Sequence, residues 1–189
     1  MSTQIPNKME GFNYYRSKTS WQGEADDGNL VKLKTEELVY ACSYTEAESI
    51  AYALIEQENR ARFSTPTFEI IKTKIDELVF NDTLVTDGSL TKGLVNCYFA
   101  ETDETGVGLY GVKVMFIQLD ERSGKEKRSH TTIHVPAKSN ADASAIVSRY
   151  LQSSPKRGDF VVRDAKFDAT SAIFWPSEFY KQISSNKVV

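Results

Sequence analysis

The sequence predicts an α+β protein with an internal duplication of a ββαβ unit, in which each antiparallel sheet is covered by one helix. Two observations predict this fold. Along Val31–Ile55 the apolar residues first alternate, as in a half-buried strand, and then follow the longer period of an amphipathic helix. A shift of 96 residues, which carries Val39 to Val135, finds the same strand and helix again in the same phase. In each copy a further strand follows the helix.

Both helices have a predicted start and a predicted buried face. Thr45 and Glu48 have the spacing of a capping box, so we expect the first helix to begin at Thr45. Its apolar stripe consists of Ala47, Ile50, Ala51, Leu54 and Ile55. Ser139 or Asn140 is the expected cap of the second helix. The matching stripe there consists of Ala143, Ile146, Val147, Tyr150 and Leu151.

The flanking strands extend the match between the two copies. Upstream, the shift of 96 residues also carries Tyr14 to Tyr110. Downstream, a shift of 92 residues matches Phe68 with Phe160, Lys74 with Lys166 and Asp76 with Asp168. The smaller downstream shift predicts a shorter loop after the second helix.

Turn-forming and polar stretches divide the chain. The predicted parts are a polar tail over 1–11, a first ββαβ repeat over 12–82, a connecting segment with one strand over 83–108, a second ββαβ repeat over 109–175 and a C-terminal extension over 176–189. Besides the central strands, the expected strands are Phe12–Trp21, Phe68–Ile75, Gly93–Ala100, Leu109–Leu119 and Phe160–Phe167. Gly23–Gly28 and Asp120–Arg128 are the expected hairpin tips, and Asn81–Thr91 is the expected joint between the copies.

Composition narrows the class of protein. With 40% hydrophobic and 26% charged residues, the 189-residue chain has the balance of a soluble globular protein. It has no apolar run of membrane-spanning length and no signal-peptide core, so we expect a cytoplasmic protein without a membrane partner. Cys42 and Cys97 lie in apolar runs and are predicted to be buried thiols. A net charge of −3 argues against coating duplex DNA by charge alone.

Two stretches, Lys32–Ser49 and Phe116–Ala137, resemble a family of small domains of unknown function encoded by Bacteroidetes and their gut bacteriophages, including crAss-like phages. The segments SYTEAE and LDERSGKEK carry the resemblance, which extends from Tyr14 to Phe174. It implies a phage or bacterial accessory protein, acting in the host cytoplasm if phage-encoded. It supplies no catalytic residues, and it favours single-stranded nucleic acid as a partner.

No motif in the sequence predicts an enzyme, a cofactor or a metal site. The Gly106–Gly111 stretch has the spacing of a dinucleotide-binding loop, but a strong strand follows it where that loop requires a helix. His130 and His134 lie on one face of a predicted strand about 13 Å apart, too far to share a metal ion. We therefore interpret both as exposed strand histidines and expect a non-enzymatic protein.

The charged residues of the two hairpin tips allow three interpretations of their function. Charged tips are most simply solvated surface. Alternatively, the second copy binds single-stranded nucleic acid, with Tyr110 or His130 stacking on bases. The residues predicted for this role are Arg122, Lys125, Lys127, Arg128, His130, Lys156, Arg157, Arg163 and Lys166.

In the third interpretation the chain is an oligomeric structural or interaction module, for example a phage component or an inhibitor of a host protein. The acidic first tip of one subunit would then meet the basic second tip of the next. The residues predicted for this interface are Glu24, Asp26, Asp27, Phe174, Trp175, Phe179 and Tyr180. For the four aromatic residues, closure of the core is the alternative.

Overall fold

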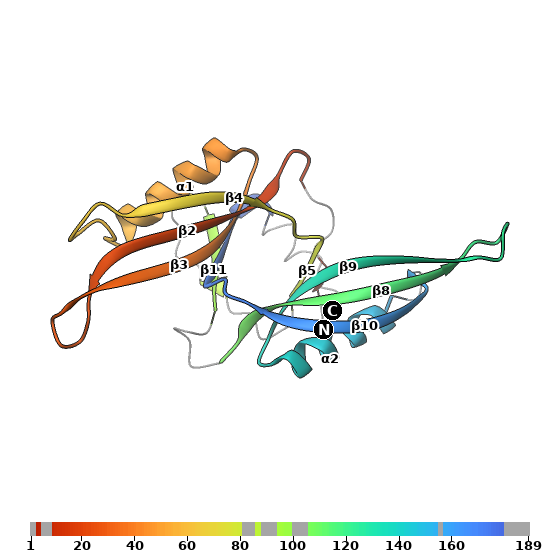
Figure 1. Ribbon diagram of the computed structural model, residues 1–189. Helices are drawn as coiled ribbons and strands as arrows, with labels where there is room; N and C mark the ends of the chain where they lie inside the picture. The colour runs from red at the N-terminus through yellow and green to blue at the C-terminus, as the bar shows by residue number, and fades with distance from the viewer. Residues whose placement is uncertain are drawn as a thin grey trace.

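The computed structural model describes residues 3–4, 9–80, 86–87, 94–99, 106–154 and 157–179. It is an α+β fold with two long helices, as predicted, but both sheets are mixed where antiparallel sheets were predicted (Figure 1). The first copy contains β1 (Thr3–Gln4), β2 (Asn13–Glu24), β3 (Leu30–Ala41), α1 (Tyr44–Gln57), β4 (Thr67–Thr73) and β5 (Glu77–Phe80). Two further strands, β6 (Thr86–Asp87) and β7 (Leu94–Tyr98), lie in the segment predicted to hold one. The second copy contains β8 (Gly108–Leu119), β9 (Glu126–Ala137), α2 (Asn140–Gln152), β10 (Asp159–Asp168) and β11 (Ala172–Pro176).

The internal duplication is confirmed by β3, β9 and the helix starts. Strands β3 and β9 begin and end 96 residues apart, from Leu30 to Glu126 and from Ala41 to Ala137, and their burial follows the same order residue by residue. Ser43 caps α1 and Ser139 caps α2, again at this offset. Each cap has an extended backbone and accepts a hydrogen bond from the N–H three residues later.

Two predictions about the first copy are wrong. The cap lies two residues before the predicted Thr45, because Ser43 and Glu46 form the capping box. Ser43 Oγ accepts from Glu46 N at 3.1 Å, and Glu46 Oε2 accepts from Cys42 N at 2.6 Å. The two possible boxes overlap in sequence, and Thr45 lies in the first turn. Cys42 is exposed at this helix entrance, whereas Cys97 is buried as predicted.

The register of the sheets also corrects two of the predicted offsets. Tyr15 pairs with Val39 and Tyr110 with Val135, so Tyr110 corresponds to Tyr15, at an offset of 95, and not to Tyr14. The loop 120–125 is one residue longer than the loop 25–29, which accounts for the change to 96 after the hairpin. In the strand after each helix, Tyr15 pairs with Lys72 and Tyr110 with Phe167, which gives 95 and not 92.

The last strand of each copy joins the sheet of the other copy. Strand β5 pairs in parallel with β9 of the second copy, and β11 pairs in parallel with β3 of the first (Figure 1). The antiparallel neighbour of each exchanged strand joins the same sheet: β1 pairs with β5, and β7 pairs with β11. The sheet orders β4-β2-β3-β11-β7-β6 and β10-β8-β9-β5-β1 therefore correspond strand by strand, apart from β6. The two copies are related by an approximate two-fold axis.

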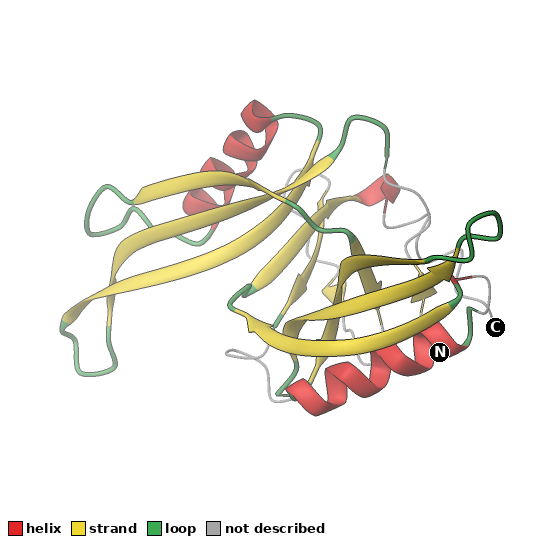
Figure 2. Ribbon diagram, turned by 45° about the vertical axis from the view of Figure 1, so that its right-hand side comes forward, coloured by secondary structure: helices red, strands yellow, loops and turns green. Residues whose placement is uncertain are grey.

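Each sheet has a covered face and a face turned towards the other copy. Helix α1 packs on Tyr15, Val39 and Phe174, and α2 packs on the matching face of β8, β9 and β10. The helices lie on opposite outer sides of the molecule (Figure 2). A third apolar cluster joins the copies through residues such as Leu38 of β3 and Leu109 of β8. No helix in the described ranges is both long and apolar enough to cross a membrane.

The late aromatic residues belong to these cores, so their predicted role in an interface is wrong and the core alternative is right. Phe174, Trp175 and Phe179 have at most 2% of their surface exposed. Trp175 Nε1 also donates to Tyr14 Oη at 3.0 Å, which satisfies both buried polar groups. Phe174 and Trp175 are buried because β11 is an interior strand of the first sheet, whereas Phe179 follows β11 and packs on Tyr40. Tyr180 lies outside the described residues.

The exchange of strands predicts that neither half folds alone. Residues 1–90 and 91–189, produced separately, should each lack a cooperative unfolding transition, because each would lose an interior strand and expose the cluster between the copies. Mixing the halves should restore the far-ultraviolet circular dichroism spectrum and the melting transition of the intact chain. A stable, cooperatively folded monomer from either half would contradict this.

Candidate functional site

A polar cleft of about 510 Å³ lies where the two sheets meet. The first sheet contributes Arg16 from β2 and Glu36 from β3. The second sheet contributes residues of β8, β9 and β10, among them Lys113, His134 and Lys166. These side chains share a cleft because all project from the faces opposite the helices, at the junction that the exchanged strands create.

Arg16 links the two copies across the cleft. Its guanidinium donates to both carboxylate oxygens of Asp168 at 2.9 Å, to Thr170 Oγ1 at 2.9 Å and to Glu36 Oε2 at 3.3 Å. The side chains of Arg16 and Asp168 are only 15% and 14% exposed. Burial opposes ionisation of Asp168, but the hydrogen bonds from Arg16 and Thr170 outweigh it and lower the pKa of this carboxyl group. The bidentate pair therefore fixes the relative position of the sheets at this point.

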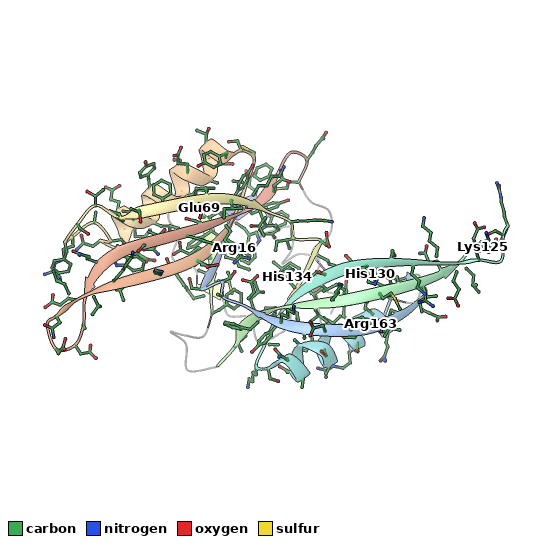
Figure 3. The ribbon with its side chains drawn as sticks, viewed as in Figure 1. Arg16, Glu69, Lys125, His130, His134 and Arg163 are labelled. Atoms are coloured by element: carbon green, nitrogen blue, oxygen red, sulfur yellow. The ribbon has the colours of Figure 1, made fainter. Side chains whose placement is uncertain are left out.

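His134 forms the floor of the cleft on the second copy. It is 8% exposed, and not exposed as predicted, because it lies at the junction of the two sheets (Figure 3). Its Nε2 lies 3.8 Å from Asp168 Oδ2, and its Nδ1 has no hydrogen-bond partner among the described residues. Burial lowers the pKa of the imidazole, against the opposing effect of Asp168, so His134 is neutral at pH 7.

Gly111 keeps the cleft open beside this imidazole. It faces His134 across the β8–β9 ladder, and a Cβ atom on Gly111 would lie 3.3 Å from His134 Nε2 and from Thr132 Cγ2. The corresponding residue of the first copy is Arg16, which faces Leu38. The cleft is therefore built from equivalent positions of the two copies that carry different side chains.

Cations extend from the cleft along the uncovered faces of both sheets. Lys18 and Lys113 correspond at the offset of 95, and Lys32 and Lys34 correspond to Arg128 and His130 at the offset of 96. All six are exposed. Arg16 and His134 lie at the junction of the sheets, His130 and Arg163 lie further along the second sheet, and Lys125 lies at its tip (Figure 3).

The structure separates the residues predicted to bind nucleic acid. Arg128, His130, Arg163 and Lys166 share the uncovered face of the second sheet, and Arg122 and Lys125 lie in the exposed tip. Lys127 projects to the opposite face, on the side of α2, because side chains alternate along β9. Lys156 lies outside the described residues.

Two other predicted contacts have structural roles. Arg157 donates to both carboxylate oxygens of Glu77 at 2.7 and 3.0 Å, and Tyr150 Oη donates to the same carboxylate. This network holds β5 against α2, so Arg157 is not available to a ligand. Tyr110 packs edge-on against Phe167, with ring centroids 5.5 Å apart, on the face covered by α2.

The sequence interpretation missed Arg16, Lys18 and the cations of β3. Lys32, Lys34 and Glu36 occupy alternating positions of the predicted strand, which is the signal of a charged, uncovered face. No group of three or more metal-ligating side chains suited to a metal ion occurs in the described part of the chain.

The bridge between Arg16 and Asp168 predicts that loss of Arg16 lowers the stability of the folded protein. Arg16→Ala should lower the free energy of unfolding by about 3 kcal/mol, because it leaves the Asp168 carboxylate largely buried without its cation. Lys18→Ala is the control, since Lys18 makes one exposed contact of 3.7 Å to Glu36 and should cost about 0.5 kcal/mol or less. Urea unfolding followed by circular dichroism measures both. Equal costs for the two variants would show that the bridge contributes no more than a surface pair.

Comparison with known proteins places the chain in a family without assigning it an activity. No curated protein matches the sequence. A family described as "Domain of unknown function (DUF4494)" matches residues 13–176, which span β2 to β11 and thus both copies with their exchanged strands. The chain belongs to the DUF4494 family.

Proposed function

We propose that the chain binds single-stranded nucleic acid across the uncovered faces of its two sheets, with the polar cleft at the centre of the path. The observation that carries the proposal is the repetition of cations at equivalent positions of both copies, Lys18 with Lys113 and Lys32 with Arg128, on the faces that meet at the cleft. A row of cations at strand spacing suits a phosphate backbone that runs over a sheet.

The proposed partner is a single strand because unpaired bases can stack on a side chain that lies among the cations. Unpaired bases expose flat apolar surfaces that stack on side chains of an open sheet. The imidazole of His130, exposed on the uncovered face of the second sheet, offers such a surface. The net charge of −3 does not favour the charge-driven coating of a duplex. In this proposal the protein is a non-enzymatic accessory protein, in line with its resemblance to phage and Bacteroidetes domains.

A charge-reversal pair tests the proposal. Lys32→Glu with Arg128→Glu should weaken binding of labelled single-stranded oligonucleotides about tenfold or more, because it removes a phosphate contact from each sheet. Lys127→Glu with Lys138→Glu changes the net charge equally but places the changes on the side of α2 and before that helix, so affinity should change little. Fluorescence anisotropy at low and raised salt measures both. Absence of binding by the unaltered protein at low salt, or equal loss in the two variants, would refute the proposal.

A second candidate is an interaction module that uses the hairpin tips. Both hairpins project beyond the helices (Figure 1). The first tip combines the exposed acidic side chains of Glu24, Asp26 and Asp27 with Leu30, which is 54% exposed. The second tip carries four basic side chains against three acidic ones, a net charge of +1: Arg122, Lys125, Lys127 and Arg128 against Asp120, Glu121 and Glu126. Opposite charges at the two ends suit a head-to-tail contact between copies of the chain, or a charged site on a host protein.

Self-assembly through the tips predicts a salt-sensitive oligomer. Light scattering should give a mass above the monomer at low salt, which falls as salt shortens the screening length to about 8 Å and below. Asp26→Lys with Asp27→Lys should abolish the oligomer, whereas reversal of Glu56 and Glu48 on α1 should not. A monomer at low salt and high protein concentration would exclude self-assembly.

A further inference from the structure

We infer that the central cleft is a binding site for one nucleoside phosphate, either a free mononucleotide or one nucleotide of the bound strand. The strand form rests on the proposed function; the mononucleotide form does not. The volume of about 510 Å³ lies within the range of small-ligand sites. Its lining carries both cations and hydrogen-bonding groups, which a ligand with a phosphate and a polar base would require.

The cations that can bind the phosphate are Lys113 and Lys166. They project from neighbouring strands β8 and β10 on the same face, because Lys166 pairs with Gly111, two residues from Lys113. Among the described residues Lys166 pairs with Asp164 at 3.8 Å, and its side chain is 83% exposed. Arg16 is different, because Asp168, Thr170 and Glu36 already occupy its guanidinium. The phosphate site therefore lies on the second copy.

The space for the base lies beside Gly111, Thr132 and His134. The Cβ atom that Gly111 lacks would stand 3.3 Å from His134 Nε2, so the cleft reaches the edge of the imidazole there. A neutral imidazole both donates and accepts hydrogen bonds, as the edges of bases do.

The difference between the copies limits the site to one nucleotide. At the positions equivalent to Gly111 and His134, the first copy has Arg16 and Leu38. The Arg16 side chain extends into the cleft, and Leu38 belongs to the apolar cluster between the copies. The first copy therefore presents neither the space nor the imidazole, although it keeps a lysine, Lys18, at the position equivalent to Lys113.

Isothermal titration calorimetry with the four nucleoside 5′-monophosphates, and with inorganic phosphate, tests the inference on the full chain. At least one monophosphate should bind about tenfold more tightly than inorganic phosphate. Gly111→Leu, which fills the cleft, and Lys113→Gln should each weaken binding of that monophosphate about tenfold or more. Lys127→Gln, on the side of α2, should leave the affinity for the monophosphate unchanged. Thermal melting verifies that the variants fold, and Gly111→Ala replaces Gly111→Leu if the larger side chain prevents folding.

The outcomes distinguish the two proposals. If monophosphates bind in the cleft while oligonucleotides do not bind at all, the cleft site stands and the strand-binding function fails. If oligonucleotides bind and Gly111→Leu leaves their affinity unchanged, with no monophosphate bound, the function stands and the cleft site fails. Equal affinity for inorganic phosphate and for every monophosphate, or equal loss in Lys127→Gln and Lys113→Gln, would also overturn the inference.

Discussion

The reciprocal exchange of β5 and β11 is the constraint on which the remaining structure depends. Each strand lies in parallel against the central strand of the other copy and brings an antiparallel partner with it. A parallel neighbour requires a crossover, and here the crossover is the passage from one copy to the other. The apolar cluster between the copies is enclosed by these passages, so the two helix-covered cores and the cluster that joins them form one cooperative unit.

The cleft is a direct consequence of this arrangement. The end of β10 and the segment that leads to β11 hold the partners of Arg16, because Asp168 and Thr170 accept its hydrogen bonds. In the same segment, Ser171 N donates to Glu36 O at 2.8 Å. The opposite crossing, before β5, is fixed in a comparable way by Asp76, whose carboxylate accepts from Thr132 N and Thr131 Oγ1. Two uncovered sheet faces are thus held against each other at an angle that leaves a polar space between them. The helices cannot cover these faces, because each lies on the outer side of its sheet.

Periodicity predicted the elements that pack locally and failed where contacts are distant. The strand and helix around Val39 and Ala47 have their counterparts where the shift of 96 residues places them, because the alternation of apolar residues reflects a buried face that both copies share. Strands β5 and β11 are short apolar runs, and nothing in such a run specifies which sheet it joins. Matching the tyrosines at 14 and 110 concealed a loop that is one residue longer in the second hairpin. The contact of Arg16 with Asp168 spans 152 residues, so only the completed fold brings the cleft together.

The pair of equivalent positions occupied by Arg16 and Gly111 has an evolutionary meaning. In a homodimer of identical subunits, every substitution near the symmetry axis appears twice, so an arginine that closes one side of a site also closes the other. Joining the two units in one polypeptide removes that restriction. One of the two equivalent positions can then hold an arginine that links the copies, while the other stays open as part of a cleft. Covalent linkage thus lets a symmetric scaffold carry a single asymmetric site without a second gene.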